Sequence, residues 1–327
     1  MINSPRDGFA VEIRSVSHKY GTRQALDQVS FSVKHPEIFA LLGPNGGGKS
    51  TLFKILSTQM QASAGTAEVM GHDVVRDPAA VRRHLGVVFQ SPSIDKKLTA
   101  EENLLHQGHL YGLKGGALTQ RISDALAAVG LGARTRDRAE KLSGGMQRRV
   151  EIAKALLHDP SVLLLDEPST GLDPGARMEV WDYLVNARNQ RSITSLLTTH
   201  LMEEAEKADR VAIIHRGKLV ACGTPAELKA AIGGEVVELT TNHPEILRNQ
   251  IRDLMGGNPL VIDAKTVRVE TPRDIEAAGA KLLLHLLEAF PGTVLSSRIG
   301  LPTLEDVFIH CTGERYRSDA TPEVQAA

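Results

Sequence analysis

A glycine-rich segment near the N-terminus has the residue types and spacing of a phosphate-binding loop. It reads GPNGGGKST and matches the pattern G-x-x-x-x-G-K-[ST]. Successive backbone N–H groups can surround a phosphate only where no side chains intervene, which accounts for the glycines. Lys49 would reach the β- and γ-phosphates of a nucleotide, and the Ser50 hydroxyl would ligate Mg²⁺. The residues predicted to contact phosphate are Gly43, Pro44, Asn45, Gly46, Gly47, Gly48, Lys49, Ser50 and Thr51.

Two adjacent carboxylates, Asp166 and Glu167, follow the apolar run Val162–Leu165. A phosphoryl-transfer site needs a carboxylate at the end of a neighbouring strand to hold its metal, and Asp166 suits that position. Two such groups at a buried strand end repel each other unless a cation and water compensate. One would hold Mg²⁺ through water, and the other could polarise an attacking water. The structural alternative is a charged strand end that leads into a turn at Pro168.

These residues require an α/β framework to position them. The apolar run Ile38–Gly43 is typical of a strand buried on both faces, and Ser50–Gln59 reads as a helix. The glycine-rich segment therefore connects a strand to a helix, as a phosphate loop should. Short strands are expected within residues 9–40 and at 68–70, 85–89, 162–168, 192–199 and 211–215, with helices at 174–189 and 201–208.

Two further regions differ in pattern from this framework. Residues 100–158 carry helical spacing of apolar residues, which predicts a helical subdomain over about 91–160. Residues 226–312 are predicted to form a small α+β domain with a ferredoxin-like order of elements, and the polar tail 313–327 to be disordered. In that domain, strands are expected at 235–240, 259–263, 266–270 and 293–298, and helices at 243–255, 273–290 and 302–311.

Composition narrows the class of protein. A length of 327 residues indicates roughly two domains. Lys and Arg number 38 against 39 Asp and Glu, so the basic excess of a nucleic-acid binder is absent and no nucleic-acid partner is expected. No run approaches the roughly 18 apolar residues of a membrane span, and the N-terminus lacks the apolar core of a signal peptide. Two cysteines fit a reducing compartment.

The stretch LSGGMQRR at Leu142–Arg149 lies between the phosphate loop and the paired carboxylates. It resembles the signature motif of the nucleotide-binding subunits of ATP-binding cassette (ABC) transporters, which kinases and GTPases lack. The resemblance spans residues 9–225 and implies a P-loop NTPase fold: a RecA-like core with an antiparallel β subdomain and a helical subdomain. The positions that match the family's motifs, in chain order, are Tyr20, Gly43–Thr51, Gln90, Leu142–Met146, Asp166–Glu167, Ser169–Asp173 and His200.

The resemblance implies a role for each matched position. Tyr20 would stack on adenine, and its structural alternative is a tyrosine on a strand surface. Gln90 would complete the Mg²⁺ shell and sense the γ-phosphate. Glu167 would be the general base, and His200 would contact the γ-phosphate and orient the attacking water. The implied cofactors are ATP and Mg²⁺, with the metal held by Ser50, Gln90 and Asp166.

Two positions depart from the commonest family pattern. Gly47 stands where alanine is common, which should not harm phosphate binding. Met146 stands where glutamine is commonest, and methionine there also occurs in the drug-export branch. The segment LPTLEDVFIHCTG (Leu301–Gly313) resembles the closing segment of drug- and polysaccharide-type exporter ATPases, including daunorubicin-resistance-like subunits.

The resemblance also implies two protein partners. In the family, the signature residues clamp the ATP held by the other subunit, so Ser143, Gly144 and Gly145 imply a head-to-tail homodimer with two sites. The helical insert would dock on a transmembrane permease, which must be a separate polypeptide.

The expected function is therefore an ATPase subunit, cytoplasmic and peripheral on the inner face of the cell membrane, that powers export of a drug, lipid or polysaccharide. The alternative is a soluble ABC ATPase that acts on ribosomes or DNA. Such proteins usually carry two cassettes or long coiled coils, and neither feature is present. A nucleotide-sensing module without turnover is disfavoured by intact Glu167 and His200.

Overall fold

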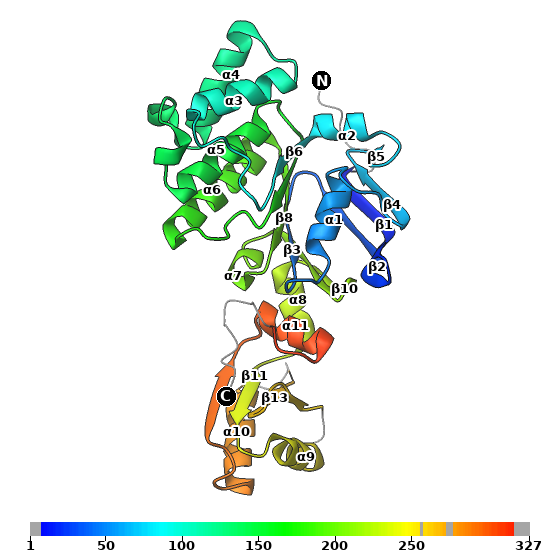
Figure 1. Cartoon of the computed structure of the whole chain (residues 1–327). Helices are drawn as coiled ribbons and strands as arrows, with labels where there is room; N and C mark the ends of the chain where they lie inside the picture. The colour runs from blue at the N-terminus through cyan, green and yellow to red at the C-terminus, as the bar shows by residue number, and fades with distance from the viewer. Residues whose placement is uncertain (1–7, 256–257, 273–276, 317–327) are drawn as a thin grey trace.

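A computed structural model describes residues 8–255, 258–272 and 277–316 of the chain. Figure 1 shows a larger part built on two sheets, from which a smaller part with its own sheet extends. Helices α8 (Pro225–Ile232) and α11 (Leu304–Thr312) lie at the junction of the two.

A six-stranded sheet forms the centre of the larger part. Its order is β10-β9-β3-β8-β7-β6, with parallel pairing from β9 to β6 and an antiparallel β10 at the edge. Every residue of β3 and β7 is buried, which confirms the prediction of strands covered on both faces. The strands are β3 (Ile38–Leu42), β6 (Leu85–Val88), β7 (Val162–Asp166), β8 (Thr194–Thr199), β9 (Arg210–His215) and β10 (Lys218–Gly223).

The two faces of this sheet pack into separate cores. Phe39 and Leu41 of β3 join a core with helix α1 (Lys49–Leu56) and an antiparallel sheet of order β2-β1-β4-β5. Ala40 and Leu42 join the core on the opposite face, which contains the long helices. The antiparallel strands are β1 (Phe9–Tyr20), β2 (Arg23–Lys34), β4 (Ala64–Val69) and β5 (His72–Asp73), followed by helix α2 (Pro78–His84).

The segment between β6 and β7 is helical, as its sequence pattern indicates. Thr99 and Glu102 form a capping box that begins α3, since each side chain bonds the other residue's backbone N–H. The helices are α3 (Ala100–Leu110), α4 (Gly115–Ala128) and α5 (Gly144–Leu156), with short 3₁₀ turns η2 (Gly132–Arg134) and η3 (Ala139–Lys141). Helix α6 (Pro174–Arg191) follows β7.

Helix α7 (Met202–Ala205) is much shorter than the helix predicted at 201–208. The Asp209 carboxylate accepts the Ile38 N–H at 2.7 Å and two bonds from Arg188. After Ala205 the N–H groups of Lys207 and Ala208 bond the carbonyls three residues earlier, so the chain continues in turns up to Asp209.

The smaller part has the predicted β-α-β-β-α-β order and a fully antiparallel sheet of order β12-β13-β11-β14. Helices α9 and α10 share one core with this sheet, around Leu247, Val267 and Leu286. The elements are β11 (Val236–Thr240), α9 (Pro244–Met255), β12 (Leu260–Val261), β13 (Thr266–Glu270), α10 (Ala278–Ala289) and β14 (Ser296–Gly300). Part of the helix predicted at 273–290 falls on residues 273–276, which lie outside the described residues.

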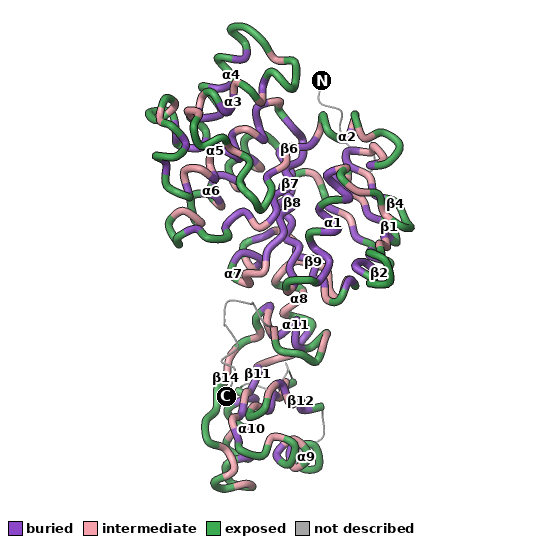
Figure 2. Tube along the Cα trace, in the orientation of Figure 1, coloured by how far each residue is buried: buried purple, intermediate pink, exposed green. Residues whose placement is uncertain are grey.

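Helix α11 belongs to the core of the larger part. Leu304, Val307 and Phe308 are buried there with residues of α5 and α6, and Figure 2 shows buried positions along this helix. The α/β core, antiparallel sheet, helical region and C-terminal α+β region are those expected from the sequence. The domain boundary predicted at residue 225/226 stays a prediction. Helix α8 begins at that boundary and α11 follows it in the chain, yet their buried residues pack in the core of the larger part.

Residues 314–316, at the start of the tail predicted to be disordered, contact the rest of the chain. Glu314, Arg315 and Tyr316 each bond a different part of the protein, which fixes the backbone there. Residues 317–327 lie outside the described residues.

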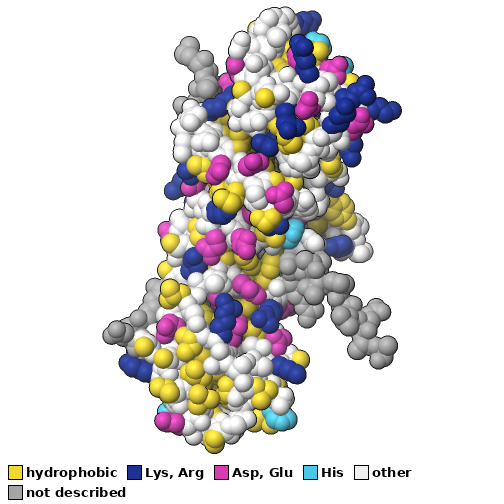
Figure 3. Space-filling model, turned by 90° about the vertical axis from the view of Figure 1, so that its left-hand side faces the viewer, with side chains coloured by type: hydrophobic (Ala, Val, Ile, Leu, Met, Phe, Trp, Pro, Cys, Tyr) yellow, Lys and Arg dark blue, Asp and Glu magenta, His cyan; other side chains and the backbone are white. Residues whose placement is uncertain are grey.

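The surface in Figure 3 mixes charges of both signs, and hydrophobic side chains gather over the smaller part. Within the described ranges, no helix has the length and apolar character needed to cross a membrane.

Candidate nucleotide-binding site

The glycine-rich loop connects β3 to α1, as predicted, and its backbone requires glycine at specific positions. Gly46 and Gly48 have φ values of 75° and 111°, which side chains rarely adopt. A Cβ at Gly48 would lie 2.6 Å from the Ala25 carbonyl oxygen. At Gly47, φ is ordinary and a Cβ would lie 3.0 Å from the Pro44 carbonyl oxygen, so an alanine there needs only a small local shift. A side chain is excluded at Gly43 because its Cβ would collide with the Ile214 carbonyl.

Lys49, the first residue of α1, points its ammonium group into this loop. Nζ donates to the carbonyl oxygens of Gly43 at 2.7 Å and Pro44 at 3.1 Å, and the residue is only 4% exposed. A buried cation beside a glycine-rich backbone at the N-terminus of a helix is an arrangement that attracts phosphate groups.

The loop forms one wall of a cavity of about 370 Å³. Tyr20 stands at its rim, 47% exposed, with its hydroxyl 3.4 Å from Met60 Sδ. Arg23 lines the cavity as well, and the sequence pattern did not single it out. The cavity is lined by Tyr20, Arg23, Ala25, Asn45, Gly46, Gly47, Gly48, Lys49, Ser50, Thr51, Gln90 and Glu167.

Asp166 lies at the end of β7, 8% exposed and behind this lining. Its Oδ1 accepts a hydrogen bond from Thr198 Oγ1 at 2.6 Å. Burial raises the pKa of Asp166, and adjacent Glu167 raises it further, while the bond from Thr198 lowers it. A desolvated carboxylate of this kind fits a divalent cation, which would restore the charge compensation that water no longer provides. With the Ser50 hydroxyl on the cavity wall, these oxygen donors suit Mg²⁺.

Glu167 has a backbone conformation that directs its side chain. Its φ is 45°, in the left-handed region that residues other than glycine rarely adopt. Thr198 holds it there, because the Glu167 N–H donates to Thr198 O at 3.2 Å and to Oγ1 at 2.9 Å. Backbone strain that the surrounding structure maintains is a recurrent feature of functional sites.

The carboxylate of Glu167 is the point where the predicted polar residues meet. Oε1 lies 3.9 Å from Lys49 Nζ. Oε2 accepts from Gln90 Nε2 at 3.2 Å and from Thr170 Oγ1 at 3.1 Å, and lies 3.3 Å from His200 Nδ1. Gln90 and Glu167 face the cavity, whereas His200 is not among its lining within the described chain. The structure thus brings together residues up to 151 positions apart in sequence.

The signature residues are not at this cavity. Ser143 caps α5 by accepting the Met146 N–H at 3.3 Å, and both Ser143 and Gly144 are exposed. A Cβ at Gly144 would meet nothing within 4 Å, whereas one at Gly145 would lie 2.6 Å from Ala176 Cβ in α6. Among the described residues that line the cavity, none belongs to this motif.

Arg148 is a central residue that the sequence analysis missed. It is buried, and its guanidinium donates to Pro168 O at 2.9 Å, Phe89 O at 2.6 Å and Asp166 O at 3.0 Å. It also pairs with Glu151 at 2.8 Å. One side chain of α5 therefore holds the loop before Gln90 and the loop of the two carboxylates. The available signal was a charged i,i+3 pair inside a helix with apolar neighbours.

The fold and this site define a P-loop nucleotide-binding ATPase. The family model for ABC transporters matches residues 26–170. The daunorubicin/doxorubicin resistance ATP-binding protein of Streptomyces peucetius is 37% identical over 322 residues, covering 96% of each chain. The linearmycin resistance ATP-binding protein of Bacillus subtilis (strain 168) is 33% identical over 310 residues, covering 94% of this chain and 99% of the relative.

A solved dimeric structure of an ATP-binding cassette in a post-hydrolysis state, bound to ADP and Pi, aligns with a TM-score of 0.59 and 26% identity. The alignment covers 65% of this chain and 98% of that one. The chain belongs to the ATP-binding proteins of ABC transporters, in the family of the daunorubicin resistance proteins, and hydrolyses ATP coupled to transport.

Proposed function

We propose that the chain powers the export of a small molecule through a separate transmembrane permease. Its similarity to two drug-resistance ATP-binding proteins extends over nearly the whole length of each, C-terminal region included. Their names favour a drug-class substrate over the lipid and polysaccharide classes. The chain would act on the cytoplasmic face of the cell membrane, where its helical segment between β6 and β7 docks on the permease.

Within the site, each polar residue takes one task. Lys49 and the loop amides hold the β- and γ-phosphates, and Tyr20 stacks on adenine. Ser50, Gln90 and Asp166 hold magnesium, which when bound offsets phosphate charge. Glu167 accepts the proton of the attacking water, and His200 orients that water and the γ-phosphate. The observation that carries this assignment is the Glu167 carboxylate, bonded by Gln90 and Thr170 and 3.9 Å from the Lys49 ammonium.

Two copies of the chain would complete each site. Ser143 and Gly144 are exposed at the N-terminus of α5, which favours an anion, yet they do not line the chain's own cavity. A second copy placed head to tail would bring these amides to the first copy's γ-phosphate. The solved dimeric cassette is a related precedent. ATP would then hold the dimer closed, and hydrolysis would release it.

The Glu167→Gln variant tests this assignment directly. We expect it to bind ATP, to lose turnover and to elute from gel filtration with Mg-ATP as a dimer. Glu101→Gln, in the first turn of α3 and absent from the described lining of the cavity, should behave as wild type. Undiminished turnover in the Glu167 variant would remove that residue from the role of base.

Lys49→Ala tests the phosphate loop, with Lys54→Ala on the exposed side of the same helix as its control. We expect ATP affinity to fall at least tenfold in the first variant only. ATP binding that stays tight without the Lys49 ammonium would contradict the assignment.

The export role is tested by isolating the tagged full chain from membranes of its native host. Recovery of a membrane protein with several apolar spans would support it. That protein should be bound without a covalent link, so that a change of detergent is enough to release it from the chain. Recovery with ribosomes or DNA instead would favour the soluble alternative.

A further inference from the structure

The segment Gly313–Tyr316, which follows α11, reaches the backbone of His200, whose side chain lies beside Glu167 of the nucleotide site. The Tyr316 hydroxyl donates to the carbonyl oxygen of His200 at 3.0 Å. The Tyr316 ring is half-buried and packs edge-on against Phe308 of α11, with ring centroids 5.0 Å apart. This contact joins residues 116 positions apart in sequence.

The two preceding residues tie the segment to both parts of the molecule. Glu314 accepts a bond from Arg216 at 2.6 Å and lies 3.4 Å from His215, at the end of β9. Arg315 pairs with Asp263, in the turn before β13, at 2.7 Å. Three consecutive side chains therefore connect the larger part, the smaller part and the peptide of His200.

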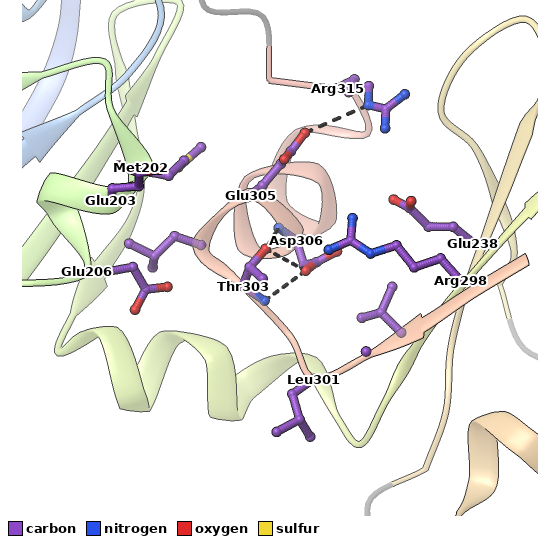
Figure 4. A pocket seen from close by; sticks show the side chains of 13 residues that line it. Met202, Glu203, Glu206, Glu238, Arg298, Leu301, Thr303, Glu305, Asp306 and Arg315 are labelled. Carbon is purple, nitrogen blue, oxygen red and sulfur yellow. Dashed lines mark hydrogen bonds and ion pairs between the residues drawn. The ribbon is translucent and has the colours of Figure 1, made fainter. Parts of the chain in front are cut away.

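The surroundings of His200 make this one hydrogen bond important. Its Nδ1 lies 3.3 Å from Glu167 Oε2, and its carbonyl leads into α7, a helix of only four residues. Next to α7 is a cavity of about 300 Å³, lined by Met202 and Glu203 on one side and by Glu305 of α11, whose carboxylate points toward Arg315 (Figure 4). Among the described residues, the Tyr316 hydroxyl is the group that hydrogen-bonds the His200 carbonyl, so its bond directs the peptide just before α7.

We propose that Tyr316 is a positioning residue for His200 and couples the C-terminal part of the chain to ATP hydrolysis. The inference rests on the role proposed above for His200. When the hydroxyl holds the His200 carbonyl, the peptide keeps the imidazole against Glu167. When the smaller part shifts against the larger one, Arg315, which is paired with Asp263, carries the movement to the adjacent Tyr316, and the imidazole turns away. Small displacements of a catalytic group reduce rate strongly while leaving substrate affinity intact.

The test is Tyr316→Phe in the full chain, which keeps the ring on Phe308 and removes only the hydroxyl. We expect Mg-ATP turnover to fall roughly three- to tenfold, the range set by loss of one hydrogen bond. The dissociation constant for Mg-ATP should stay within about twofold, since Tyr316 is absent from the cavity lining among the described residues. Amide hydrogen exchange should accelerate over residues 199–205. Tyr111→Phe, which alters a tyrosine stacked on His158 instead, should change none of these quantities.

His200→Ala and the double variant separate failure of this inference from failure of the proposed role of His200. If Tyr316 acts through His200, Tyr316→Phe lowers turnover no further in the His200→Ala background. Two outcomes overturn the inference alone. One is a further multiplicative loss of turnover when Tyr316→Phe is added to His200→Ala. The other is unchanged turnover and amide exchange in Tyr316→Phe while His200→Ala lowers turnover. Unchanged turnover in His200→Ala removes the role of His200 and the inference with it. If His200→Ala leaves no measurable turnover, the turnover and exchange of the single Tyr316 variant decide.

Discussion

At the scale of single residues, the charge of Asp166, which we propose holds magnesium, destabilises the nucleotide-free fold. Its pKa is raised, chiefly by burial, so the folded state binds a proton more readily than the unfolded state does. The free energy of unfolding therefore falls as pH rises from the unfolded pKa of Asp166 to its raised folded pKa, and the loss is complete above the folded pKa. The Thr198 hydroxyl compensates only in part.

We therefore expect Asp166→Asn to stabilise the nucleotide-free chain at pH 7 by roughly 0.5–2 kcal/mol, because the amide keeps an acceptor for Thr198 without the buried charge. In Mg-ATP the wild type should become more stable than the Asp166 variant, because the wild type gains stability from the ligand and the variant gains much less. Thermal unfolding with and without Mg-ATP measures both effects. Exposed Asp182→Asn serves as the control and should shift stability by under about 0.5 kcal/mol in either condition. Lower stability of the Asp166 variant without nucleotide would contradict this account.

At the scale of elements, helix α5 organises the two loops that carry Gln90 and the paired carboxylates. Arg148 bonds the carbonyls of Phe89, Asp166 and Pro168, and Glu151 accepts the backbone N–H of Ser93. The helix that presents the signature residues at its start thus fixes both loops by its side chains. A displacement of α5 would move the two loops that carry Gln90 and the paired carboxylates, because the Arg148 guanidinium is bonded to both.

Arg148→Lys tests that arrangement, because a lysine ammonium cannot reproduce the planar fork of donors. We expect it to lower the free energy of unfolding by about 2–4 kcal/mol, since buried carbonyls and Glu151 lose their partners. Mg-ATP turnover should fall tenfold or more, while the protein still binds ATP through the loop at 43–51.

The neighbouring Arg149→Lys is the matched control for that experiment. Arg149 bonds Val129 O and the exposed Glu179, away from the cavity, so its variant should lose under about 1 kcal/mol and keep its turnover. Equal effects of the two substitutions would show that Arg148 only packs the helix.

The same elements show which structural features a sequence can predict. The strand, loop and helix over 38–56 are encoded by adjacent residues, and the prediction of each was confirmed within a few positions. Helix α8 was missed although Thr224 and Glu227 form a capping box and Pro225 occupies its first turn, signals present in the sequence itself. The bonds of Arg148 and Tyr316 depend instead on how distant segments fold together, and no local pattern encodes them.

At the scale of the whole molecule, the C-terminal region contributes to two cores. Phe308 of α11 is buried with the helices of the larger part and meets His215 and Tyr316 edge-on. Leu286 of α10 is equally buried, in the separate core beneath the sheet β12-β13-β11-β14. The chain should therefore unfold in two thermal transitions. Mg-ATP should raise the midpoint temperature of only the transition that includes α11.

Phe308→Ala and Leu286→Ala distinguish these cores by calorimetry of the full chain. Truncation of a buried phenylalanine costs about 3–5 kcal/mol and of a leucine about 2–5 kcal/mol, because each leaves a cavity. The Phe308 variant should lower the midpoint temperature of the transition that responds to Mg-ATP, although Phe308 lies near the end of the chain. The Leu286 variant should lower the midpoint temperature of the other transition and leave that of the nucleotide-sensitive transition within about a degree. If Leu286→Ala lowered both transitions together, the two cores would unfold as one unit, and movement between the two parts would not be available to act on His200.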